Sequence, residues 1–423
     1  MRLVITSAFV LSCFAQSALV AAELTSQEKA IVAYVDAHQA EFESELEAAV
    51  RISSATENLA GVRQMGEFFR ERFAAVGFES RFVELPVSTG RAGHLVAEHK
   101  GTKGQRVLLI GHLDTVFPVA TVRRDGPVLH GSGVADMKGG DMIMLQALRA
   151  LKAAGALDDT QIVVVMSGDE EAQGTPLEVV RKDMLEAGKR SDVALAFESA
   201  VGNTGTIARR GSFSWELEVQ GATGHSSGIF SDTMGAGSVY ETARILQGFY
   251  QELKAMDGLT ANAALIAGGV EADLSRTGGT VSGKTNIIPQ RTLVRGDLRP
   301  ISAQQLEEAK ARMQAIVAKH LPRTSATLKF NEGYPPMPPS DGSYSLLSKL
   351  DRVSQDLGFA PIAAFDPRAR GAGDISFVAP PLPGLDGLGL GGKGEHTVNE
   401  SADLTPASEL TKRAALLIYR LTR

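Results

Sequence analysis

The chain has 423 residues, which is longer than one typical domain, so we expect two domains. Hydrophobic residues make up 43% and charged residues 22% of the chain, as in an ordinary soluble globular protein, and the net charge is −6 at pH 7. With this charge and no basic tract, the composition argues against a nucleic-acid partner, and no apolar run after the N-terminus is long enough to span a bilayer.

Residues 1–22 predict an export signal. Arg2 precedes an apolar stretch over 3–20, and Val20-Ala21-Ala22 supplies the small residues that a signal peptidase needs. A membrane anchor or a lipoprotein signal acylated at Cys13 would also fit this stretch. We expect an exported protein, periplasmic or secreted, with no membrane contact once the signal is cleaved. Cys13 is the only cysteine, so the mature chain would hold a metal through histidine and carboxylate groups, which suits catalytic zinc.

After this segment, the sequence alternates between predicted helices and strands. Periodicity predicts helices over 24–50 and 57–76 and strands near 79–85, 94–99 and 107–111. The alternation continues with helix 138–153, strand 162–167, helix 175–187 and strand 193–198. This order predicts the α/β class, with a mostly parallel sheet and helices on both faces. Ligands of such sheets gather at the carboxyl ends of the strands.

From about residue 209 the pattern changes. A half-buried strand over 212–219 is followed by helix 235–254, strands near 262–270, 279–288 and 291–299, and helix 302–318. This order predicts an α+β sandwich whose sheet is open on one face. The proline-rich stretch 333–339 reads as a linker, after which helix 342–356, a strand near 361–364 and helix 404–420 resume the first pattern. We therefore expect a first domain in two parts, 23–208 and 331–423, with a second domain inserted over 209–330.

An imidazole and a carboxylate lie two positions apart where strand 107–111 ends. In an extended backbone the side chains of His112 and Asp114 leave the same face, so the carboxylate can hold one ring nitrogen while the other faces a metal. Hydrogen-bonded histidines are common at strand ends, so this pair alone fits a structural role equally well.

Acidic groups and a second histidine follow at other predicted strand ends. Asp136 precedes helix 138–153, where it could be a helix cap or a ligand, but the Gly139-Gly140 pair costs stability unless something approaches the backbone closely. Further along the chain come Asp169-Glu170-Glu171, Glu198 and, in a glycine-rich loop, His396. A solvated charge run and a solvated loop histidine are the plain alternatives. Acids crowded at one sheet edge, however, need a cation or a proton to relieve them.

Five ordered motifs together resemble those of a known family. They are Gly111-His112-Leu113-Asp114-Thr115-Val116, Asp136-Met137-Lys138-Gly139-Gly140, Asp169-Glu170-Glu171, Phe197-Glu198 and Glu395-His396. They are similar to motifs of the co-catalytic di-zinc exopeptidases, which include glutamate carboxypeptidase, aminoacylase and succinyl-diaminopimelate desuccinylase. The motifs are most similar to those of glutamate carboxypeptidase, and the resemblance runs from about residue 50 to the C-terminus.

The resemblance implies two zinc ions per subunit. His112 and Glu198 would hold one ion, Glu171 and His396 the other, and Asp136 would bridge them. Asp114 would orient His112, and Glu170 would be the general base that takes a proton from a zinc-activated water and passes it to the leaving nitrogen. The family also places a cis peptide after the bridging aspartate, here Asp136-Met137.

The resemblance also assigns roles in the inserted domain, which would be a lid and dimerisation domain. His225 resembles the lid histidine that reaches a neighbouring subunit's site and stabilises the oxyanion, so a homodimer is expected. Asn286 and Arg299 match positions that contact the substrate carboxylate, and Gly373 lies in the loop that lines the specificity pocket. A loop histidine, a turn asparagine and a surface arginine are the plain alternatives.

The chain departs from the family pattern at three places. Residues 331–334, Asn-Glu-Gly-Tyr, stand where glutamate-specific relatives carry an arginine, which puts strict glutamate preference in doubt. His225-Ser226-Ser227-Gly228 and Gln173-Gly174-Thr175-Pro176 also differ from the commoner residues, with effects expected on pocket shape. The prediction is a zinc-dependent, carboxypeptidase-like exopeptidase that cleaves an amide bond beside a free carboxylate in short peptides or N-acyl amino acids. An N-acyl amino acid deacylase and, more remotely, a binding protein with a dead site are the alternatives.

Overall fold

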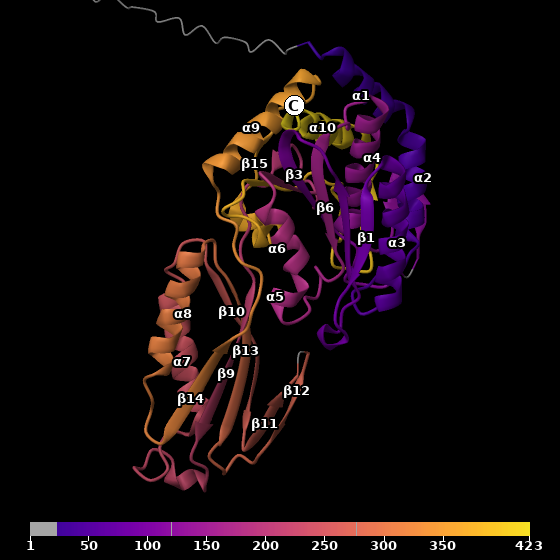
Figure 1. Cartoon of the computed structure of the whole chain (residues 1–423). Coiled ribbons are helices and arrows are strands. Elements are labelled where there is room, and N and C mark those ends of the chain that lie inside the picture. Colours follow the sequence, from indigo (N-terminus) through magenta and orange to yellow (C-terminus); the bar gives the residue numbers. More distant parts are fainter. Residues whose placement is uncertain (1–22, 120, 276) are drawn as a thin grey trace, which may run out of the picture.

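The computed structural model describes residues 23–119, 121–275 and 277–423, which form two bodies, each built around its own sheet (Figure 1). The predicted export signal over 1–22, with Cys13, lies outside the described residues. Among the residues that are described, no helix combines the length and the apolar character needed to cross a membrane.

The larger body contains a six-stranded sheet. Its strands, in spatial order, are β1 (Glu79–Glu84), β2 (Gly93–His99), β6 (Thr160–Ser167), β3 (Lys103–His112), β7 (Val193–Ala196) and β16 (Gly384–Leu385). The four strands from β6 to β16 are parallel, whereas β1 and β2 pair antiparallel at one edge. The expectation of a mostly parallel sheet is confirmed.

Strand β3 shows that both faces of this sheet are covered. Val107 and Leu109 pack into the main core, whereas Leu108 and Ile110 pack into a second apolar cluster on the opposite face. The main core is shared with α1 (Ser26–Ala37), α2 (Gln39–Val50), α3 (Leu59–Val76), α4 (Gly139–Ala153), α9 (Asp341–Asp356) and α10 (Ala407–Leu421). The second cluster includes Met184 and Ala187 of α6 (Lys182–Lys189). Helices on both faces therefore agree with the predicted class.

Two predicted helices are interrupted. The helix expected over 24–50 breaks at His38, whose main-chain N–H closes α1 on Tyr34 and whose ring stacks on Tyr34 at a centroid distance of 3.8 Å. The helix expected over 175–187 is divided at Arg181 into α5 (Leu177–Val180) and α6. Arg181 has φ −106° and ψ 6°, and its guanidinium is buried against Asp169.

The smaller body contains a four-stranded antiparallel sheet in the order β10 (Thr260–Gly269), β13 (Arg291–Arg299), β9 (Phe213–Gly221) and β14 (Thr324–Phe330). Helices α7 (Gly237–Leu253) and α8 (Ala303–Val317) cover one face (Figure 1). The predicted alternation in β9 is confirmed, because Trp215, Leu217 and Val219 are buried against these helices.

The other face of this sheet carries a hairpin that the sequence did not predict. It consists of β11 (Glu271–Leu274) and β12 (Gly279–Ser282), and Ala272 and Leu274 pack against Ala267 of β10. Figure 1 shows the hairpin on the side of the sheet away from α7 and α8. The strand expected over 279–288 therefore ends at Ser282, and the expected open face is partly covered.

Short strands tie the chain together between and around the two bodies. β8 (Thr204–Gly205) pairs in parallel with β15 (Ala363–Ala364), and the bridges Arg209–Met337 and Ser212–Tyr334 hold the outgoing and returning connections side by side. A three-stranded sheet joins β17 (Ser401–Asp403), β5 (Val128–His130) and β4 (Arg123–Asp125). It brings the C-terminal part of the chain beside the loop that carries Asp136.

Candidate metal centre

The predicted site residues meet at the carboxyl ends of three neighbouring parallel strands. His112 is the last residue of β3, Glu170 and Glu171 follow β6, and Glu198 follows β7. Because β3 pairs with both β6 and β7, these side chains share one edge of the sheet. This is the edge at which parallel sheets bind their ligands.

Asp136 lies between the two predicted histidines. One carboxylate oxygen is 3.1 Å from Nε2 of His112, and the other is 3.0 Å from Nε2 of His396. Nε2 of His396 is also 3.2 Å from a carboxylate oxygen of Glu171. Candidate ligand atoms of His112, Asp136 and Glu171 all lie within 4.8 Å of one another. These four side chains offer only nitrogen and oxygen ligands, which suit zinc.

The hydrogen bonds of His112 show that this arrangement fits a cation. Its Nδ1 is 3.0 Å from the main-chain oxygen of Asp114, and since a carbonyl only accepts, Nδ1 carries the proton. A neutral His112 therefore directs the lone pair of Nε2 at the Asp136 carboxylate, which is also an acceptor. Two acceptors 3.1 Å apart need a proton or a cation between them.

The pKa values of the residues in the cluster also indicate a cation site. Burial raises the pKa of Glu170 well above its ordinary value, and the charge of Glu198 raises it further. Burial also raises the pKa of Glu171 to about 7 and that of Glu198 to about 7. Hydrogen bonds to Asp136 and Glu171 raise the pKa of His396 to about 11. Without a metal the site must take up protons, so its residues fit a divalent cation.

Asp114 differs in detail from the expected partner of His112. The main-chain oxygen, and not the carboxylate, hydrogen-bonds the ring, and the nearer carboxylate oxygen lies 3.6 Å from Nδ1. The carboxylate instead accepts the hydroxyl of Thr56 at 2.6 Å and the main-chain N–H groups of Glu170 and Glu171 at 3.0 and 3.1 Å. Asp114 thus holds the acidic loop after β6 in place.

The loop that carries Asp136 explains the two glycines after it. A Cβ atom on Gly140 would lie 1.8 Å from the carbonyl oxygen of Phe197, and one on Gly139 would lie 2.5 Å from that of Val134. The close approach expected from the sequence is therefore real. The helix-cap alternative for Asp136 is wrong, because α4 has no side-chain cap and the carboxylate faces the imidazoles. The Asp136–Met137 peptide is cis, as the resemblance implied.

Two buried networks that the sequence did not reveal support the acidic residues. Near Glu198, Arg209 donates from Nε to Asp386 at 2.5 Å and places Nη2 3.9 Å from the Glu198 carboxylate. Near Glu170, Tyr334 donates its hydroxyl to the main-chain oxygen of Glu170 at 2.7 Å and accepts from Arg181 at 3.1 Å. Arg209, Asp386 and Arg181 lie outside the five motifs and have no spacing signal.

His225 and Asn286 lie away from the cluster within one chain. Both are exposed, and the main-chain N–H of Ser226 donates to the oxygen of Asn286 at 2.9 Å, so the two predicted residues are neighbours. The segment that holds His225 follows the end of β9 opposite to the connections with the larger body. The role predicted for His225 at the site of a neighbouring subunit stays a prediction.

Arg299 and Gly373 are placed on the side of the connections. Arg299 ends β13, opposite Thr260, and its Nε donates to Asp297 at 2.8 Å, so it lies at the other end of β13 from Asn286. Gly373 lies against Arg209, since a Cβ atom there would be 2.6 Å from the guanidinium carbon. The roles predicted for these two residues in substrate binding stay predictions.

Comparison with known proteins identifies relatives over most of the chain. Residues 108–421 match peptidase family M20/M25/M40. The chain is 25% identical over 392 residues to carboxypeptidase G2 of Pseudomonas sp. (89% of this chain, 88% of the relative) and 25% identical over 372 residues to succinyl-diaminopimelate desuccinylase of Bordetella avium (84% and 91%).

Solved structures share the fold. A tripeptidase from Staphylococcus aureus superposes with a TM-score of 0.70 at 18% identity, covering 91% of this chain and 99% of that one. An M20 family metallo-carboxypeptidase from Sulfolobus solfataricus gives 0.67 at 14% identity, covering 90% and 99%.

Proposed function

Because this chain belongs to peptidase family M20/M25/M40, and is a hydrolase acting on amide bonds, we propose that it is a zinc-dependent exopeptidase of the carboxypeptidase type. It would cleave an amide bond beside a free carboxylate in short peptides or N-acyl amino acids. The observation that carries this proposal is the Asp136 carboxylate, with one oxygen on each of two imidazoles that lie 284 positions apart in the sequence (396 − 112).

The proposed ligands divide between two zinc ions. His112 and Glu198 would hold one ion, and Glu171 and His396 the other, with Asp136 shared. The contacts of His396 with both Asp136 and Glu171 support the second set. When bound, a zinc pair supplies Lewis-acid polarisation of the carbonyl and makes water acidic near neutral pH.

Glu170 is the proposed general base. It lies in the same acidic loop as Glu171, and burial raises its pKa well above the ordinary value, which strengthens it as a proton acceptor. The water proton would pass to Glu170, the carbon–oxygen bond would form, and the same proton would go to the nitrogen as the carbon–nitrogen bond breaks. His225 of a second copy would stabilise the oxyanion, and Asn286, Arg299 and Gly373 would line the substrate site.

A deacylase of N-acyl amino acids is the second candidate. Identity alone does not decide between the two functions, because carboxypeptidase G2 and succinyl-diaminopimelate desuccinylase are each 25% identical to the chain. In both reactions the substrate carries a free carboxylate on the carbon next to the amide nitrogen, and cleavage of the carbon–nitrogen bond releases that nitrogen as an amine. Tyr334 stands in the segment where an arginine was expected for glutamate-specific relatives, and its hydroxyl is committed to Glu170 and Arg181. We therefore do not assign glutamate as the preferred residue.

The experiment that tests the function is a substrate panel on purified, zinc-loaded protein. Dipeptides and N-acyl amino acids would each be offered with a free and with an amidated α-carboxylate. Hydrolysis of the free acids alone supports the proposal, and the faster series decides between peptidase and deacylase. Equal rates on free and amidated substrates would contradict the exopeptidase assignment, and binding without hydrolysis across the panel would favour a binding protein.

A homodimer through the smaller sheet is part of the proposal. β10 is an edge strand of ten residues without a charged side chain, and most of it is exposed, which makes it a template for pairing with another chain. Beside it, α7 presents an exposed, uncharged stripe of Tyr240, Ala243, Gln247 and Tyr250. Monomeric proteins rarely expose such surfaces together.

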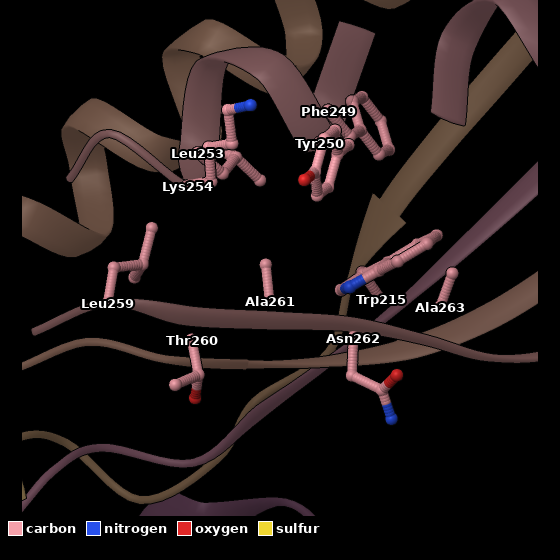
Figure 2. Close-up of a pocket in the computed structure, with 10 residues that line it drawn as sticks. All are labelled: Trp215, Phe249, Tyr250, Leu253, Lys254, Leu259, Thr260, Ala261, Asn262 and Ala263. Carbon is pink, nitrogen blue, oxygen red and sulfur yellow. The ribbon is translucent and has the colours of Figure 1, made fainter. Parts of the chain in front are cut away.

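A cavity of about 480 Å³ lies between α7 and β10 (Figure 2). Ala261 and Ala263 point toward the helix while Thr260 and Asn262 point away, and Trp215 closes one side. The small alanine side chains leave the gap that the helix does not fill. We propose that this edge is covered by the second copy, which light scattering at micromolar concentration would show as twice the monomer mass; an active monomer would contradict it.

Export is the last part of the proposal. It rests on the N-terminal sequence described above, and the mature protein is expected to begin at Glu23. N-terminal sequencing of protein recovered outside the cytoplasm tests this. Recovery of the intact chain from the cytoplasm alone would contradict it.

A further inference from the structure

We propose that Glu400 is a positioning residue for the metal centre. Its carboxylate fixes the main chain of the loop that carries Asp136, while the hairpin to which it belongs carries His396. The inference rests on the proposed metal site, but not on the proposed substrate. Glu400 was not among the residues that the motifs identified.

Glu400 makes four hydrogen bonds with one loop. Its carboxylate accepts the main-chain N–H groups of Gly133 at 2.6 Å, Ala135 at 2.9 Å and Asp136 at 3.0 Å. Its main-chain oxygen accepts the N–H of Gly131 at 3.1 Å. The residue is only 5% exposed, so these bonds are shielded from water. A buried carboxylate that accepts several N–H groups is a strong anchor.

The loop needs this acceptor because its backbone is irregular. Gly133 has a φ of 78°, and Asp136 has a φ of −111° and a ψ of 90°. Gly133 and Ala135 are buried, and a buried N–H without an acceptor is costly. One carboxylate satisfies three of these groups at once and thereby sets the direction in which Asp136 leaves the backbone.

The same residue helps to place His396. Main-chain hydrogen bonds of 2.8 and 2.9 Å between Lys393 and Ser401 close the base of a hairpin, with His396 in its tip and Glu400 beside the base. The His396 side chain is 61% exposed, so packing does not hold it. Its position opposite Asp136 therefore depends on how the hairpin is fastened to the loop, to which both Glu400 and the pairing of β17 with β5 contribute.

A charge effect and a positioning effect of Glu400 predict different zinc affinities for three variants. Glu400→Asp keeps the negative charge but is one methylene too short to reach all three N–H groups. Glu400→Gln loses the charge but keeps an oxygen for the N–H groups of Ala135 and Asp136, which share one carboxylate oxygen in the structure. Glu400→Ala removes both. Asn399→Ala, an exposed neighbour in the same hairpin, is the matched control.

Zinc affinity would be measured by competition with a chromogenic chelator, with no substrate present, on variants whose circular dichroism matches that of the unchanged protein. We expect Glu400→Asp and Glu400→Ala to bind zinc about 10- to 100-fold more weakly, Glu400→Gln to lose less, and Asn399→Ala to be unchanged. Excess zinc should restore kcat in Glu400→Gln with KM unaltered, since the ligands themselves are intact.

Two results would overturn the inference. Zinc affinity within about twofold of the unchanged protein in Glu400→Asp and Glu400→Ala would show that the anchor is dispensable. Loss of affinity in Glu400→Gln and Glu400→Ala, with Glu400→Asp unchanged, would assign the effect to charge. A failure of the substrate panel would leave these binding results standing, so the two proposals fail separately. If Glu400→Ala does not fold, the Asp and Gln variants still decide.

Discussion

The hydroxyl of Tyr334 donates to the main-chain oxygen of Glu170 at 2.7 Å, although the two residues are 164 positions apart. Tyr334 is buried and lies in the connection that returns from the smaller sheet, so it links that connection directly to the acidic loop. We expect Tyr334→Phe to lower kcat about fivefold with KM unchanged, because about 1 kcal/mol of support for the loop is lost. Steady-state kinetics measures this, with Tyr344→Phe, on the exposed side of α9, as the control. An unchanged kcat would mean that the loop keeps its shape without this bond.

Glu170 is the residue on which turnover should depend most. Glu170→Gln keeps the size of the side chain but cannot take a proton, so kcat should fall by about 10²- to 10⁴-fold. Zinc content, measured by elemental analysis, should not change, since Glu170 is not a proposed ligand. Glu178→Gln, exposed on α5, serves as the control. Full turnover in Glu170→Gln would show that another group is the base.

Removal of metal should inactivate and destabilise the protein. The acidic residues around Asp136 repel one another once the cation is gone, and ligand binding at 100 times Kd is worth about 2.7 kcal/mol. Dialysis against a chelator should therefore abolish hydrolysis and lower the Tm by on the order of 5 °C, and zinc should restore both. Scanning calorimetry with and without zinc measures the shift. In Asp136→Asn, zinc should raise the Tm much less, and an equal rise would exclude Asp136 as a ligand.

The pH dependence of stability should reflect Glu45. Burial alone would raise its pKa, but the hydrogen bonds and charges of Arg149 and Arg72 outweigh burial and lower it. A carboxylate with a lowered pKa stabilises the fold above its unfolded pKa, and this contribution is lost as pH falls below about 4.5. Urea unfolding measures the free energy of unfolding at pH 7 and at pH 3.5. The difference between the two values should be about 1 kcal/mol smaller in Glu45→Gln than in the unchanged protein.

Glu47→Gln provides the matched control for this experiment. Glu47 is on the same helix, and its ion pair with Arg51 is mostly exposed, so its removal should leave the pH difference nearly unchanged. Equal behaviour of the two variants would show that the buried pair of Glu45 has no special weight.

A charge on the edge of the smaller sheet should dissociate the proposed dimer. Ile266 of β10 is 61% exposed, so Ile266→Lys adds a charge to the edge without disturbing the core of one chain. Light scattering should then give the monomer mass, and hydrolysis should fall because His225 of a second copy is missing. Val87→Lys, 96% exposed on the larger body, should remain dimeric and active. A dimeric, active Ile266→Lys protein would place the interface elsewhere.

The sequence predicted the order of elements well where the pattern of apolar residues was regular, either periodic or continuous. Leu108 and Leu109 pack on opposite faces of β3, and a strand buried on both faces reads as the continuous apolar run that was observed. Tertiary contacts explain the failures. A helix pattern runs through Arg181, but its guanidinium turns inward to Asp169 and breaks the helix there. Strand β11 is only four residues long, which is too short for its alternation to stand out.

In the site too, residues in local motifs could be predicted, whereas residues that act through tertiary contacts could not. His112, Asp136 and His396 lie in compact motifs, because a ligand and its neighbours must lie at a strand end or in a glycine-rich turn. Asp386 accepts from Glu198 and Arg209, and Tyr334 bonds to Glu170 and Arg181. These partners are far away in sequence, and any loop could supply an aspartate or a tyrosine. Such contacts become visible only when the chain is folded, since main-chain N–H and C=O groups carry no sequence signal.

The hairpin that holds His396 and Glu400 comes from the end of a chain of 423 residues. A polypeptide still emerging from the ribosome can already form β3, β6 and β7, yet it lacks one imidazole and the anchor of the Asp136 loop. The centre therefore closes only after the chain has been synthesised as far as this hairpin. A nascent chain that lacks this hairpin therefore has no complete metal centre. Its backbone cannot be hydrolysed by such a centre while it is still unfolded.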